Sequence, residues 1–269
     1  MEMNSFNKAR RSYKIFVIFH NTIDLGYFDP SVLDNIIFVN VNPSNPNRYP
    51  NIHLINLYEL PGFISLGKWY TESEVIYNVY RNKELTEGLD YLGFIHYDID
   101  FTPVNEEFIQ DIMGKYAVVN FQPNSFQNDF DQQILMDPAQ PDVQTGAGIN
   151  CYVPIFEDLN KFYGTNYNLK DYFSKNINLC SCFLIKMDLF REMMEFASKI
   201  IESRKLDAFD TSRKYRIQGG FMERYFGVWS MLKIDGAKDL RLRHDFVQTH
   251  IQMPFFRRIK SRLAAFLRK

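Results

Sequence analysis

The stretch "YLGFIHYDIDF", residues 91–101, begins as an apolar run and ends in two acidic residues. The run from Tyr91 to Ile95 has the composition of a strand buried in a parallel sheet. Asp98 and Asp100 follow one residue apart, and in an extended segment both carboxylates lie on the same side. Two ionised carboxylates this close repel each other unless a positive charge lies between them. The stretch therefore predicts a buried strand whose end needs a positively charged partner.

The rest of the chain repeats the alternation of apolar runs and helical segments. Further strands are predicted at residues 13–19, 36–41, 53–57, 116–121, 177–186 and 240–250. Helices are predicted at 71–85, 105–113, 188–201 and 221–232. Thr71 and Glu74 have the spacing of a capping box at the start of the first of these helices. Strands that alternate with helices predict an α/β fold with a mostly parallel central sheet flanked by helices.

Polar residues follow the carboxyl ends of these strands, which is where ligands of such sheets bind. His20 and Asn21 follow the first strand, and the acid pair follows the strand at 91–96. Mn²⁺ or Mg²⁺ is the natural partner for the pair, because these ions take one or two protein carboxylates and complete their shell with substrate phosphates. The alternative is a solvated turn with two acids and no ligand.

The composition limits the class of protein. The chain has 269 residues, 46% of them hydrophobic, which is enough for one large α/β domain or two small ones. No apolar run reaches the roughly 18 residues of a membrane-spanning helix. The first residues lack the apolar core of a signal peptide. The cysteines lack zinc-site spacing, so reduced thiols and a cytoplasmic location are expected.

The acid pair and its surroundings resemble the GT-A glycosyltransferases, which carry a D-x-D motif after a central strand. Asp98-Ile99-Asp100 matches that motif. Residues 181–196 resemble the strand and helix that precede the catalytic acid of the family, and 219–229 resemble the Gly-rich turn and helix that bear the acid, here Glu223. Met222 departs from the family pattern, because an acidic neighbour is more typical beside the catalytic acid.

The resemblance implies a single GT-A-like, Rossmann-like domain over residues 1–253. A nucleotide-sugar half would span about 13–121 and an acceptor half 122–253. It also implies a metal-dependent transfer of sugar from a nucleoside-diphosphate sugar, with UDP favoured, to a glycan or lipid-linked acceptor. Asp98, Asp100 and a late histidine would hold the metal, and His250 is favoured over His244. Glu223 would be the general base or would stabilise a positively charged sugar, and the stereochemistry stays open.

Several residues are candidates for binding the nucleotide sugar. Each has a bland alternative: a polar turn, packing of an aromatic ring, or a solvated helix face. The candidates are His20, Asn21, Trp69, Asn78, Arg81 and Asp98. His96 is interpreted as a packed histidine rather than a ligand. Residues 122–150, rich in Asn, Gln, Asp and Gly, are either a substrate loop or disordered.

Two other function classes remain open. A metal-dependent nucleotidyltransferase or phosphotransferase would also use paired acids at a sheet edge. A nucleotide-sugar binding module could keep the fold without catalysis. Turnover of a nucleotide sugar separates the glycosyltransferase from both.

The C-terminal segment 254–269, PFFRRIKSRLAAFLRK, has a different composition. It carries six lysine or arginine residues and no acid, which leaves −7 on the rest of a chain whose net charge is −1. An acidic body argues against nucleic acid as a partner. On a helical wheel the apolar residues of the segment fall within an arc of about 120°. A basic amphipathic helix of this kind predicts peripheral membrane contact, and a helix docked on the body is the alternative.

Overall fold

The computed structural model describes residues 10–45, 49, 51–67, 69–123, 152–168, 171, 181–208 and 217–245. The predicted loop beyond Pro123, the ligand role of His250 and the amphipathic segment 254–269 lie outside these residues and stay predictions. Within the described residues, no helix combines the length and the apolar character needed to cross a membrane.

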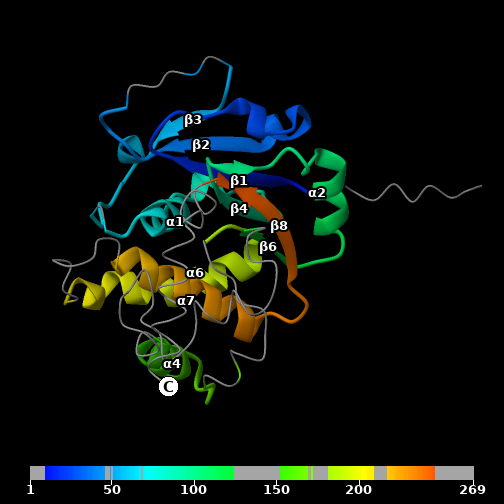
Figure 1. Cartoon of the computed structure of the whole chain (residues 1–269). Coiled ribbons are helices and arrows are strands. Elements are labelled where there is room, and N and C mark those ends of the chain that lie inside the picture. The colour runs from blue at the N-terminus through cyan, green and yellow to red at the C-terminus, as the bar shows by residue number, and fades with distance from the viewer. Residues whose placement is uncertain are drawn as a thin grey trace, which may run out of the picture.

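Eight strands of the described chain form a central sheet in the order β3-β2-β1-β4-β7-β6-β8-β5 (Figure 1). Their bounds are β1 Tyr13–Phe19, β2 Ile36–Asn40, β3 Leu54–Asn56, β4 Tyr91–His96, β5 Ile99–Asp100, β6 Val118–Pro123, β7 Phe183–Lys186 and β8 Lys238–His244. The pairs β1–β2, β1–β4, β2–β3 and β6–β8 are parallel. The pairs β4–β7, β6–β7 and β5–β8 are antiparallel. The predicted α/β fold with a mostly parallel sheet is confirmed, and β7 runs against both of its neighbours.

Apolar side chains fill both faces of this sheet, which explains why β1 and β4 are almost entirely apolar. On one face they pack against α1 (Glu72–Arg81), α4 (Tyr152–Tyr163), α6 (Met187–Glu202) and α7 (Ile217–Lys233). On the other face they pack against α2 (Glu106–Met113) and the 3₁₀ helix Pro30–Asn35. Figure 1 shows α4, α6 and α7 stacked together on one side of the sheet, away from α2. Shorter 3₁₀ turns cover Leu25–Tyr27, Leu57–Glu59, Lys83–Leu85 and Lys205–Ala208.

The start of α1 differs from the predicted capping box. Thr71 stands at the N-cap position, but its side chain makes no capping hydrogen bond and its backbone has φ 51° and ψ −127°. The Glu74 carboxylate instead accepts hydrogen bonds from the backbone N–H groups of Leu66, at 2.6 Å, and Gly67, at 3.2 Å. The capping box is therefore wrong, because the preceding loop uses the carboxylate that the box requires. The helix also ends at Arg81 rather than at residue 85.

The Gly219–Gly220 pair was expected in a turn before a helix at 221–232, but α7 begins at Ile217 and contains both glycines. A Cβ atom on Gly219 would lie 2.3 Å from Thr71 Oγ1 and 3.2 Å from the carbonyl oxygens of Trp69 and Tyr70. The Gly219 N–H donates to the Trp69 carbonyl oxygen at 2.8 Å. Glycine is therefore needed here for the close approach of α7 to the loop before α1, and the predicted turn is wrong.

We expect Gly219→Ala to destabilise the fold by about 2–4 kcal/mol, because the added methyl group overlaps Thr71 and two backbone carbonyls. The higher helix propensity of alanine offsets only about 1 kcal/mol of this. Urea denaturation measures the change. The double variant Thr71→Gly with Gly219→Ala should recover part of the loss, because it removes the nearest atom and relieves the positive φ. A Gly219→Ala protein as stable as the wild type would contradict the close approach.

Candidate functional site

The carboxyl ends of β1, β2 and β4 form a polar rim at one edge of the sheet. The ring of His20 lies edge-on to the ring of Tyr97, with the ring centres 5.2 Å apart. The Asn21 side-chain N–H group lies 3.4 Å from the Tyr97 hydroxyl as a donor. Asn42 donates to the His20 carbonyl oxygen at 3.2 Å. The structure thus brings His20 and Asn21 to the end of the central strand, beside Tyr97.

Tyr97 is a rim residue that the sequence interpretation missed. Its backbone N–H donates to the Ile18 carbonyl oxygen at 3.1 Å, so β1 holds it in place. The available signal was its position directly before Asp98, at the point where the apolar run ends.

The prediction that both acids lie on the same side of one extended segment is wrong. β4 ends at His96, residues 97–98 form a turn, and Asp100 belongs to the short strand β5. The cause is a second pairing partner, because β5 pairs with β8 and the Asp245 N–H donates to the Asp98 carbonyl oxygen at 3.0 Å. Asp98 therefore lies in the turn, and Asp100 lies in the antiparallel ladder between β5 and β8.

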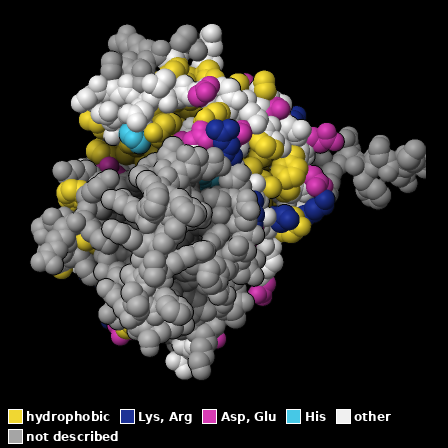
Figure 2. Space-filling view, in the orientation of Figure 1, with side chains coloured by type: hydrophobic (Ala, Val, Ile, Leu, Met, Phe, Trp, Pro, Cys, Tyr) yellow, Lys and Arg dark blue, Asp and Glu magenta, His cyan; other side chains and the backbone are white. Residues whose placement is uncertain are grey.

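Asp100 has its own partners. Its Oδ1 accepts from the Thr102 hydroxyl at 2.6 Å and from the Thr102 N–H at 3.2 Å. Arg243 is its opposite residue in the β5–β8 ladder. Figure 2 shows acidic and basic side chains next to each other on the face of the molecule that carries β8. The positive charge predicted to lie beside the acid pair is therefore supplied, at Asp100, by Arg243 of the same chain.

Arg243 also forms an ion pair with a second acidic residue, Asp245. Its Nε donates to Asp245 Oδ1 at 2.7 Å. Asp245 raises the pKa of Arg243, and the charge of Asp100 adds to this effect. The Tyr27 hydroxyl donates to the other oxygen of Asp245, and this hydrogen bond raises the pKa of Tyr27. Among the described residues, Arg243 and Asp245 thus form an ion pair beside Asp100, and Asp98 takes no part in it.

Part of the predicted metal site lies within the described residues. Within the described ranges, no group of three or more His, Cys, Asp or Glu side chains is arranged to hold a metal ion. Both acids are partly exposed, and Asp100 is in addition bonded to Thr102 and opposite Arg243 in the ladder. Mn²⁺ and Mg²⁺ need only one or two protein carboxylates when substrate phosphates supply other ligands. The described residues therefore fit an ion held by Asp98 together with phosphates of a substrate.

His244, the second choice as third metal ligand, lies in the ladder opposite Ile99 and is 2% exposed. Burial lowers the pKa of His244 to about 3, and the nearby His96 adds to this effect. His96 ends β4, and its Nε2 lies 3.7 Å from Glu72 Oε1 in the first turn of α1. Neither histidine Nε2 has a hydrogen-bond partner within the described part of the chain. Glu72 is a second rim residue that the sequence interpretation missed.

Glu223 lies in the second turn of α7, not at its opening. Residues four apart share a helix face, so Glu223 lies on the face of Gly219, which touches Thr71. Glu223 therefore lies one helical turn after the contact between Gly219 and Thr71, and Thr71 is the residue before Glu72.

The remaining candidates fall in different places. Trp69 is partly exposed, and its backbone is bonded to α7. Asn78 is 3% exposed, and its amide bonds both the N–H and the carbonyl oxygen of Ile64, at 2.9 Å each. Arg81 stacks on the Tyr77 ring, 5.6 Å from its centre. Arg81 is nine residues after Glu72, about 14 Å along the helix, so it is not brought to the rim.

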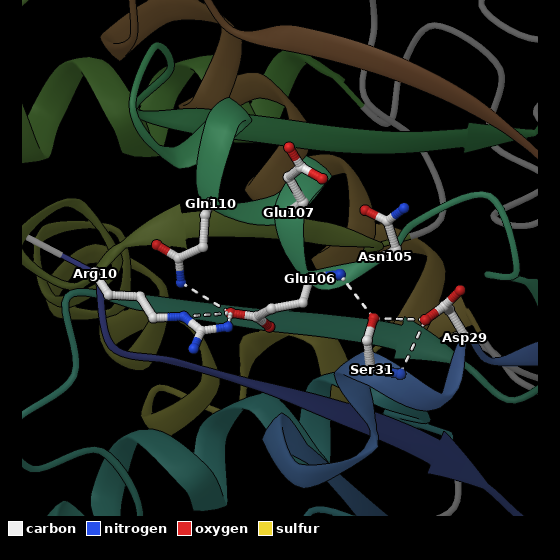
Figure 3. Close-up of a pocket in the computed structure, with 7 residues that line it drawn as sticks. All are labelled: Arg10, Asp29, Ser31, Asn105, Glu106, Glu107 and Gln110. Carbon is white, nitrogen blue, oxygen red and sulfur yellow. Dashed lines mark hydrogen bonds and ion pairs between the residues drawn. The ribbon is translucent and has the colours of Figure 1, made fainter. Parts of the chain in front are cut away.

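A cavity of about 600 Å³ lies elsewhere, near the amino end of β1 (Figure 3). Its polar groups bond one another. Arg10 Nη2 donates to Glu106 Oε1 at 2.9 Å, and Gln110 donates to the same oxygen at 3.1 Å. The Glu106 N–H donates to Ser31 Oγ at 3.0 Å. The network ties residues before β1 to α2, and we interpret it as structural.

Comparisons with known proteins address the fold. No protein-family model matches the sequence, and no curated protein does. Among solved structures, the apo form of WbbM, a bifunctional glycosyltransferase, matches 86% of this chain at 17% identity with a TM-score of 0.60. This chain covers 45% of that one, less than half of its length.

A second match is glucosyl-3-phosphoglycerate synthase from Mycobacterium tuberculosis, determined with Mn²⁺, UDP-glucose and phosphoglyceric acid. It matches 87% of this chain at 12% identity, is covered over 71% of its length, and gives a TM-score of 0.41. The likeness to WbbM, together with the mixed, mostly parallel sheet and its flanking helices, shows that this chain has a GT-A-like glycosyltransferase fold.

Proposed function

We propose that this chain is a glycosyltransferase that moves a sugar from a nucleoside-diphosphate sugar, preferably a UDP-sugar, to a hydroxyl group of a glycan or lipid-linked acceptor. The observation that carries the proposal is the position of Asp98. It is a partly exposed acid in the turn that follows the central strand β4, beside the rim pair His20 and Tyr97, in a GT-A-like fold. The fold alone does not define the activity, and the residues of this rim support the proposal.

The rim offers separate groups for the parts of a nucleotide sugar. Asp98 would hold Mn²⁺ or Mg²⁺ together with the diphosphate of the donor. When bound, the ion neutralises negative charge that develops on the leaving diphosphate. His20 and Tyr97 offer aromatic surface for the base, and Asn21 offers an amide beside them. Residues 13–121 would thus supply the donor half.

Proton transfer needs a group on the acceptor side. Glu223 is a partly exposed carboxylate on the face of α7 that meets the loop before α1. A carboxylate there takes the proton of the acceptor hydroxyl as that oxygen attacks the sugar carbon. Residues 122–253 would supply this acceptor half.

A screen of UDP-, GDP-, TDP- and CMP-sugars with Mn²⁺ tests the proposal. Release of free nucleotide from one donor class, even by slow hydrolysis, is expected. Free nucleoside diphosphate with Mn²⁺ should also raise the melting temperature. If no sugar donor is turned over while nucleoside triphosphates are, the chain is a nucleotidyltransferase or phosphotransferase. Binding without any turnover would indicate a binding module.

We expect Glu223→Gln to lower kcat by about a hundredfold, within the range for loss of a general base. Donor affinity should be kept, because the proposed role of this carboxylate is on the acceptor side. Steady-state kinetics and donor titration separate the two effects. Glu87→Gln, at an exposed position in a turn, is the matched control. Near wild-type turnover in Glu223→Gln would show that Glu223 is not the base.

A further inference from the structure

We propose that Glu72, His96 and His244 form the subsite that binds hydroxyl groups of the donor sugar. The inference rests on the proposed function and deepens it. The three side chains come from three elements, the first turn of α1, the end of β4 and the ladder strand β8. His96 lies near both of the others, two residues before Asp98, where the sugar would follow the diphosphate.

The two imidazoles supply the first observation. Neither His96 Nε2 nor His244 Nε2 has a hydrogen-bond partner among the described residues, and both atoms are buried. Buried polar atoms in native proteins are nearly always hydrogen-bonded. A neutral imidazole Nε2 either donates or accepts one hydrogen bond. Hydroxyl groups do both, so they match either tautomer.

The carboxylate of Glu72 narrows the chemistry further. It lies 3.7 Å from His96 Nε2, so an anion bound between them would be repelled. The phosphates of a nucleotide sugar are therefore disfavoured at this subsite. The apolar face of a base makes no hydrogen bond to the Glu72 carboxylate. Carboxylates accept hydrogen bonds from hydroxyl groups, and such charge-assisted bonds are the stronger ones. Among the parts of the donor, the sugar hydroxyls fit this set.

The backbone before Glu72 is fixed by its contact with α7. Thr71 holds a positive φ of 51°, which is rare for a β-branched residue. Gly219 of α7 packs against it, at a position with no room for a Cβ. Strained residues of this kind persist where the surrounding structure fixes them, and they cluster at ligand sites. The contact aims the first turn of α1, and with it Glu72, toward the end of β4.

The test compares the affinities of UDP and of UDP-glucose or UDP-galactose, each with Mn²⁺, for the wild type, Glu72→Gln and His96→Gln. Both variants should bind UDP within about threefold of the wild type. Their affinity for the UDP-sugar should fall by about tenfold to a hundredfold, as expected for loss of a hydrogen bond to a charged or buried group. Glu84→Gln, an exposed acid beyond the far end of α1, should change neither affinity.

Deoxy analogues of the donor sugar identify which hydroxyl group each side chain contacts. If Glu72 contacts one hydroxyl, removing that hydroxyl weakens binding to the wild type but not to Glu72→Gln. Variants that weaken UDP and UDP-sugar by the same factor, or neither, overturn the subsite while the proposed function stands. A wild type that binds neither UDP nor any nucleotide sugar overturns both.

Discussion

Asp98→Asn is expected to weaken Mn²⁺-dependent binding of UDP by about a hundredfold or more, whereas Asp100→Asn should keep it within roughly tenfold. Even partners of metal ligands contribute about 10–100-fold to affinity, so loss of the ligand itself costs at least as much. Both acids are partly exposed, but Asp98 stands at the turn, whereas Asp100 is bonded to Thr102 and lies opposite Arg243 in the β5–β8 ladder. Titration of UDP with and without Mn²⁺ measures both effects.

Asp100→Asn also keeps the fold, because an amide oxygen still accepts from Thr102 and exposed ion pairs contribute about 0–1 kcal/mol. Melting curves of both variants without metal provide the control for folding. Equal loss of Mn²⁺ dependence in the two variants would show that the acids act as a pair. Unchanged dependence in Asp98→Asn would contradict the metal role of the motif altogether.

The strands at the centre of the sheet could be predicted from sequence because burial on both faces leaves a continuous apolar run. This holds for β1, β2 and β4, whose residues are nearly all buried. An apolar run indicates a strand buried on both faces, as is typical of parallel sheets, but it does not fix the direction of each strand in a mixed sheet. The reversed direction of β7 therefore could not be predicted from the segment at 177–186.

The site was harder to predict, because its geometry depends on residues far apart in the chain. The turn before Ile99 exists because β8 pairs with β5, about 145 residues later in the sequence. Gly219 has the sequence appearance of a turn residue, and only the contact with Thr71 reveals its role. Glu72 was overlooked since acids in a first helical turn are common for electrostatic reasons alone. The acid motif was found because its signal is local.

His244 should make the folded protein sensitive to acid. Its pKa is lowered from 6.5 to about 3 in the folded state by burial, with a contribution from His96. Between these values the unfolded chain binds a proton that the folded chain does not. Stability is therefore fully present above the unfolded pKa and is lost as the pH falls from about 6.5 toward 3. One pKa unit corresponds to about 1.4 kcal/mol, so the loss is expected to be a few kcal/mol.

Replacing His244 by Gln removes this titration and should flatten the pH dependence of the free energy of unfolding, measured in urea between pH 7 and pH 4. Asp29 and Asp90 have pKa values lowered by hydrogen bonds from Ser31 and Ser12. Protonation of such carboxylates in acid also lowers the stability of the folded protein. The difference between variant and wild type isolates the histidine, because these acids are common to both. His53→Gln, at an exposed position, should leave the curve of the wild type unchanged. Parallel curves for His244→Gln and the wild type would mean that His244 takes up its proton as readily in the folded chain as in the unfolded one, which contradicts its burial beside His96.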